Sequence, residues 1–117
     1  MYILNFENQS IELPEYNFDI ASNLEKAEVS NQGALPFKDK CKTIYNCLAK
    51  IVNVEELIGK FDNKIDPNRI QILFSEIVNA YNKPIIEHRI REFSETVENS
   101  QIDKIKEMVD VAKEMND

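Results

Sequence analysis

Apolar residues recur every three or four positions along most of this chain, and this spacing constrains the fold more than any other feature of the sequence. The clearest example follows Pro36 and consists of Phe37, Cys41, Ile44, Tyr45, Leu48, Ile51 and Val52. Residues with this spacing share one face of an α-helix, and such a face is buried against other elements. We therefore expect a mainly helical protein whose helices pack through these faces.

Two further helices are indicated by their start and stop signals. The first is predicted to run from Asn17, an N-cap residue, to Gly33, which favours a helix end. Its apolar positions are Ile20, Ala21, Leu24 and Ala27. The second follows Asn53 and Glu56, which have the spacing of a capping box, and it ends at Gly59.

A longer helix is predicted to begin at Asp66 and Pro67, because Asp is a good N-cap and Pro suits the first helical position. Its apolar face consists of Ile70, Leu73, Phe74, Ile77, Val78 and Tyr81. Pro84 has no amide hydrogen and clashes with the preceding turn. The helix is therefore predicted to end or kink near Asn82.

The N-terminal segment has a period of two, which is typical of strands. Its alternating apolar positions are Tyr2, Leu4 and Phe6, followed by Ile11 and Leu13. We expect a β-hairpin with its turn at residues 8–10 and its end at Pro14. Burying so few side chains does not offset the entropy lost in ordering two strands. The hairpin must therefore cover the helices of its own chain or extend a sheet in a neighbouring subunit.

The candidate functional surface lies in the last third of the chain. Its apolar residues again follow helical spacing and are Ile86, Ile90, Phe93, Val97, Ile102, Ile105 and Val109. Ser100 and Asp103 are candidate caps of a last helix. Two interpretations remain open: these residues pack on their own domain, or they form a surface that binds a partner or a second copy.

Together these patterns predict one small domain of the mainly α (α+β) class. An N-terminal β-hairpin is followed by about five amphipathic helices. The hairpin and helical core are assigned to residues 1–83, and a C-terminal helical extension to residues 84–117.

Charge and composition narrow the range of partners. The formal net charge of -7 disfavours nucleic acid, whose phosphates are bound by Lys and Arg. No apolar run is long enough to cross a membrane, and the first residues lack the pattern of a secretion signal, so we expect a cytoplasmic protein. Cys41 and Cys47 are about 9 Å apart along one predicted helix, beyond disulfide reach, and are expected to be reduced thiols.

The residue types required for catalysis are scarce. His88, the only histidine, is predicted to lie on a charged helix surface, where a general base is not expected. The Cys and His spacings do not suit zinc, and two glycines leave no phosphate-binding loop. We predict a protein without enzymatic activity that needs no cofactor or metal.

Several segments carry a family resemblance. They are Leu4-Asn5-Phe6 and Ile11-Glu12-Leu13-Pro14 before Phe18-Asp19 and Leu24-Glu25-Lys26-Ala27, then residues 40–45 around Cys41, the Glu56-Leu57-Ile58-Gly59 element and residues 72–81. In order and patterning, over about residues 2–83, the chain resembles the small tail assembly chaperones of long-tailed (siphovirus-type) phages and prophages of low-GC Gram-positive bacteria. The abundance of Ile, Asn and Lys suits such a source.

The resemblance implies a chaperone that binds the tape measure protein, a long helical chain prone to aggregation, and helps the tail tube protein polymerise around it. Members of the family often end near the position of Asn82, so the role of residues 84–117 stays open. The alternative is a small cytoplasmic adaptor or regulator, prophage-encoded or antitoxin-like, that acts by protein binding. In either case we expect a homo-oligomer, because hairpin edges and apolar helix faces favour self-association.

Overall fold

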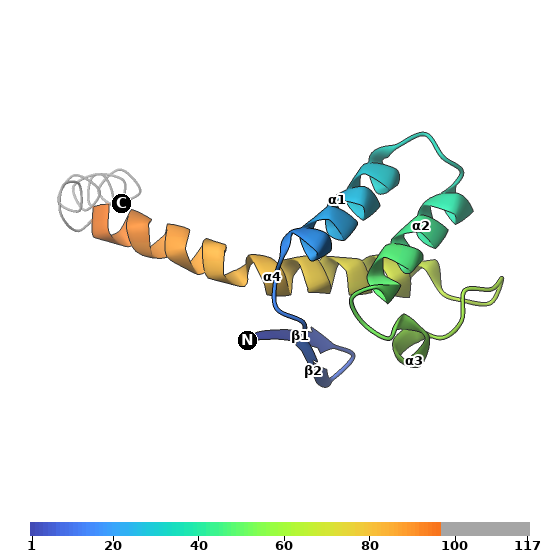
Figure 1. Cartoon of the computed structure of the whole chain (residues 1–117), viewed down its shortest axis with the longest axis horizontal. Helices are drawn as coiled ribbons and strands as arrows, with labels where there is room; N and C mark the ends of the chain where they lie inside the picture. The colour runs from blue at the N-terminus through green and yellow to red at the C-terminus, as the bar shows by residue number, and fades with distance from the viewer. Residues whose placement is uncertain (97–117) are drawn as a thin grey trace, which may run out of the picture. The chain divides into compact units, whose positions relative to one another are not determined.

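The computed structural model describes residues 1–96, with side chains through residue 94, and shows a hairpin followed by helices (Figure 1). The elements are β1 (Tyr2–Phe6), β2 (Gln9–Leu13), α1 (Phe18–Gln32), α2 (Phe37–Ala49), α3 (Val54–Ile58) and α4 (Pro67–Thr96). The mainly helical class and the N-terminal hairpin are confirmed. Four helices follow the hairpin in the described residues, where about five were predicted for the whole chain. Contacts within the chain define a first compact unit, Met1–Tyr81, and a second unit begins at Asn82.

The hairpin has a tighter turn than predicted. β1 and β2 pair antiparallel, with Tyr2 opposite Leu13 and Phe6 opposite Gln9, so only Glu7 and Asn8 lie in the turn. Both have positive φ angles, 46° and 65°, as the favoured two-residue hairpin turn requires. The predicted turn at residues 8–10 is wrong because this left-handed pair matches the strand twist and leaves Gln9 and Ser10 free to extend β2.

Short polar side chains cap the helices where the sequence predicted them. The Asn17 side-chain oxygen accepts a 2.9 Å bond from the Ile20 amide at the start of α1. The Asn53 side-chain oxygen accepts a 3.2 Å bond from the Glu56 amide at α3. At α4, Asp66 accepts a 2.9 Å bond from an amide of the first turn. These bonds satisfy amides that have no partner within the helix.

One apolar core joins the hairpin to the helices. Its most deeply buried large side chains are Leu4, Ile44, Leu48, Val54, Ile70, Leu73 and Ile77. Leu4, Phe6 and Leu13 of the hairpin belong to this core. The apolar face of the hairpin therefore covers helices of its own chain, which resolves one alternative left open by the sequence.

Arg69 of α4 connects three elements of the Met1–Tyr81 unit. Its guanidinium donates two 2.7 Å bonds to the Glu7 carboxylate in the hairpin turn. It also donates a 3.1 Å bond to the Leu57 carbonyl of α3. A planar guanidinium suits this forked geometry, which fixes the turn against both helices.

Two expectations about α2 are wrong. Phe37, assigned to the buried face, is 60% exposed, whereas Cys47, which was not assigned to it, is 3% exposed. Phe37 stands in the first helical turn, where the core no longer covers the face. Cys47 is buried because α2 is covered over a wider arc than its regular apolar face.

Pro84 does not end α4. The helix continues through Pro84 to Thr96, so Ile86, Ile90 and Phe93 belong to it and not to a separate helix. A single missing amide hydrogen leaves the other hydrogen bonds of a long helix in place. This continuity removes one of the predicted helices, and the helix predicted after Ser100 lies outside the described residues.

Candidate functional site

The predicted partner-binding residues that the structure describes lie on α4. Ile86, Ile90 and Phe93 are 47%, 60% and 69% exposed, respectively. Their spacing of four and then three residues puts them on one face of the helix. Val97, Ile102, Ile105 and Val109, the other residues predicted for this surface, lie outside the described residues. We call Ile86, Ile90 and Phe93 the α4 apolar stripe.

A polar face accompanies the α4 apolar stripe on the same helix. The His88 ring nitrogen Nε2 lies 3.0 Å from the Glu92 carboxylate, one turn further along. Both side chains are more than half exposed, at 55% and 67%. The prediction that His88 is a surface residue is confirmed. This segment of α4 is thus amphipathic, with its apolar stripe accessible to solvent.

A groove lies beside β2 in the Met1–Tyr81 unit. Its volume is about 700 Å³, and it is lined by Gln9, Ile11, Glu12, Leu13, Pro14, Ile51, Val52, Asn53, Glu56 and Leu57. One wall comes from β2 and its continuation, and the other from the α2–α3 loop and α3. We call it the β2 groove. The sequence analysis missed it because its walls are about forty positions apart in the chain.

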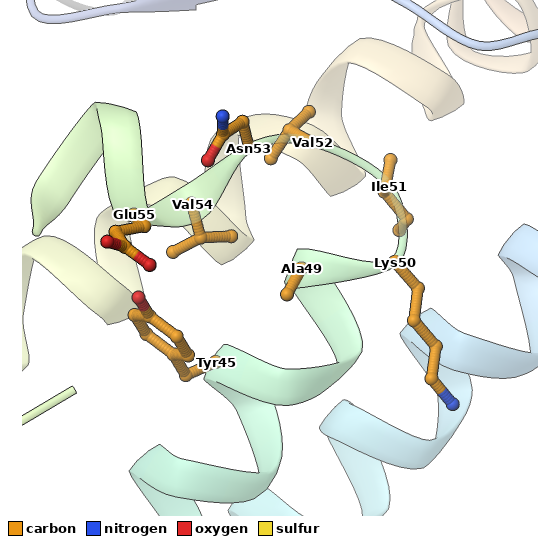
Figure 2. Close-up of a pocket in the computed structure, with 8 residues that line it drawn as sticks. All are labelled: Tyr45, Ala49, Lys50, Ile51, Val52, Asn53, Val54 and Glu55. Atoms are coloured by element: carbon orange, nitrogen blue, oxygen red, sulfur yellow. The ribbon is translucent and has the colours of Figure 1, made fainter. Parts of the chain in front are cut away.

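A second hollow adjoins the α2–α3 loop and is shown in Figure 2. It has a volume of about 430 Å³, and Tyr45, Val54 and Glu55 face it while Lys50 points away. The Tyr45 hydroxyl donates a 2.7 Å bond to the Gly59 carbonyl, which fixes the ring. Burial and the nearby Glu55 carboxylate raise the pKa of Tyr45. This tyrosine therefore serves as a neutral hydrogen-bond donor that holds the end of α3.

The other shifted ionisable groups are also structural. Burial raises the pKa of the Cys41 thiol, against a smaller opposing effect of Gln71. The hydrogen bonds from Arg69 hold the pKa of the Glu7 carboxyl below its ordinary value. Cys41 and Cys47 are both free thiols, as predicted. Within residues 1–94, no three side chains of His, Cys, Asp or Glu are grouped so that they could hold a metal ion.

None of the helices that the structure describes combines the length and the apolar run needed to cross a bilayer.

Comparisons with known proteins give no relative from which a function could be assigned. A scan against protein-family models and searches of curated proteins and solved structures found no match to this chain.

Proposed function

We propose that this chain is a non-enzymatic protein-binding protein that acts as a tail assembly chaperone of a long-tailed phage or prophage. The observation that carries the binding function is the exposure of the α4 apolar stripe at helical spacing. The tape measure protein is proposed as the client because residues 2–83 resemble this chaperone family.

The α4 apolar stripe suits a helical client. Each aliphatic or aromatic side chain that moves from water into an apolar contact gains roughly 1.5 to 3 kcal/mol. Association itself costs roughly 4 to 15 kcal/mol, so three side chains bind weakly unless the contact is extended or repeated. A long amphipathic helix, which offers many apolar residues at matching spacing, provides such a contact. A long helical client therefore suits the α4 apolar stripe better than a small globular partner.

Charge supports the same assignment. The net charge of -7 keeps a complex with an aggregation-prone client in solution and repels phosphate backbones. We propose that the protein works in the cytoplasm of the bacterial host, without a cofactor, and that it forms homo-oligomers and also assists polymerisation of the tail tube protein. These assignments follow the family resemblance and the composition.

Co-expression with a tape measure protein tests the proposal. We expect the soluble fraction of the tape measure protein to rise and the two proteins to co-purify. The triple variant Ile86→Gln, Ile90→Gln and Phe93→Gln should lose both effects because it removes the apolar stripe without adding charge. A polar-face variant with His88→Gln and Glu92→Gln is the matched control and should retain them.

Two outcomes count against the chaperone function. The first is an unchanged solubility of the tape measure protein together with no co-purification. The second is capture of a single host protein, with no tail component, which would favour an adaptor or regulator. Light scattering tests self-association separately: a monomer at every accessible concentration contradicts the predicted homo-oligomer.

A further inference from the structure

The outer edge of β2 is available for strand pairing. The sheet has two strands, and no backbone bond of Gln9–Leu13 to another element is present in the described residues. A turn of this type joins the carbonyl of its first residue to the amide of its fourth, here Phe6 and Gln9. Hydrogen-bonded pairs alternate from there, so the amides and carbonyls of Ser10 and Glu12 point away from β1.

The β2 groove lies beside this edge, and its walls combine polar and apolar side chains. Ile11 of β2 lines it together with Val52 of the α2–α3 loop and Leu57 of α3, and all three side chains are partly buried. No residue of β1 lines the groove, so it belongs to the β2 side of the hairpin. A bound strand requires unpaired edge groups beside an accessible groove in which some of its side chains can find apolar contacts.

The charged residues that line the β2 groove indicate which kind of partner can occupy it. Its ionisable residues are Glu12 and Glu56, both exposed, and no Lys or Arg lines it. Two copies of this chain, each with a net charge of -7, would bring four carboxylates together if their β2 edges paired. Like charges brought together at an interface are destabilising. A second copy is therefore disfavoured, and a segment with positive charge is favoured.

We propose that the β2 groove binds an extended segment of a partner protein, which adds to the β2 edge as a third strand. An apolar side chain of that segment inserts between Ile11 and Leu57, and its Lys or Arg side chains pair with Glu12 and Glu56. The site lies within the Met1–Tyr81 unit and goes beyond the α4 apolar stripe. It does not depend on the chaperone function, so either proposal can fail alone.

Selection from a random twelve-residue peptide library on the full chain tests this site. We expect the enriched peptides to alternate apolar β-formers with Lys or Arg. A synthetic copy of an enriched peptide is then titrated by fluorescence anisotropy. The double variant Glu12→Lys and Glu56→Lys should weaken binding at least about tenfold, because attraction becomes repulsion at two positions. Glu25→Lys with Glu28→Lys changes the net charge equally on exposed positions of α1 and should leave affinity within about twofold.

Modification of the peptide tests strand addition without altering the protein. N-methylation of one alternating set of peptide amides removes the donors to the β2 edge, whereas methylation of the other set affects amides that point away. We expect one set to abolish binding and the other to preserve it.

Several results would overturn the proposal. They are the absence of enriched peptides, binding that survives the groove charge reversal, and equal effects of the two methylation patterns. A change in oligomeric state caused by Glu12→Lys and Glu56→Lys would show that a second copy occupies the groove.

Discussion

The Tyr81 hydroxyl donates a 2.8 Å hydrogen bond to the carbonyl of Pro14, 67 positions earlier in the chain. Tyr81 is 4% exposed, and its ring lies 5.0 Å from Tyr2 and 4.9 Å from Tyr16 between centroids. The residue that ends the hairpin is thereby joined to α4 within the Met1–Tyr81 unit. Pro14 directly follows the last residue of β2, and its carbonyl has no partner in the sheet. The hydrogen bond from Tyr81 supplies that partner.

Replacing Tyr81 with Phe should destabilise the protein modestly. Tyr81→Phe keeps the ring contacts but removes the hydroxyl, so we expect a loss of about 1 kcal/mol in the free energy of unfolding. Urea denaturation monitored by circular dichroism measures it. Tyr16→Phe is the control, because Tyr16 is 43% exposed and should have little effect. An equal loss in both variants would contradict a specific role for the Tyr81 bond.

The same tyrosine predicts a loss of stability at alkaline pH. Burial, with Tyr2 and Glu15 acting in the same direction, raises the pKa of Tyr81 to about 12 from its ordinary value of 10.0. Between these values the unfolded chain has already released the proton that the folded chain retains. This contribution to stability is therefore complete below pH 10 and is lost as pH rises towards 12.

Urea midpoints measured between pH 9 and 12 check this dependence. At about 1.4 kcal/mol per pKa unit, Tyr81 contributes at most about 3 kcal/mol to the decline. Tyr81→Phe should remove that share of the slope while other groups still titrate. An unchanged slope in the variant would show that Tyr81 does not cause the decline.

The contact between Glu7 and Arg69 predicts the opposite dependence at acid pH. Hydrogen bonds from Arg69 lower the pKa of Glu7 from its ordinary value of 4.5. A depressed carboxyl pKa stabilises the folded state above 4.5, and this stabilisation is lost as pH falls through the folded value. Glu7→Gln should flatten the acid side of the stability profile in urea melts. Because both side chains are well exposed, we expect the effect to be small and to shrink with added salt.

Local signals in the sequence were sufficient for most of the secondary structure. Asn17, Asn53 and Asp66 cap the helices at which they were predicted, because capping depends on residues within one turn. Apolar spacing also identified the buried face of α4 up to Tyr81. These features depend on residues that are close in sequence, so the sequence alone is enough to predict them.

Features that depend on distant residues could not be predicted. The exposure of Phe37 depends on where the core ends, and the burial of Cys47 depends on which helix faces cover α2. The β2 groove needs β2 and α3 to be adjacent, and no spacing rule gives that adjacency. The α4 apolar stripe was found because helical spacing is local, although the sequence left open whether it faces its own domain or a partner.

Buried thiols predict slow chemical modification of the folded protein. Cys41 and Cys47 are each 3% exposed, and burial raises the pKa of Cys41, which lowers its thiolate fraction. We expect a disulfide reagent at pH 8 to react with both thiols at a rate set by opening of the structure. Reaction in urea, where both are accessible, provides the reference. Rapid modification of either thiol in the native protein would contradict its burial.

Pro84 predicts a local weakness within α4. The proline has no amide hydrogen to donate to the carbonyl of Ala80, four residues earlier, and a proline inside a helix costs about 3 kcal/mol. Pro84→Ala restores this bond, so hydrogen exchange at Ile85 and Ile86 should slow while the helical signal in circular dichroism rises. Lys83→Ala, an exposed neighbour, is the control and should change exchange little. Unchanged exchange in Pro84→Ala would mean that the missing bond does not limit helix opening at this position.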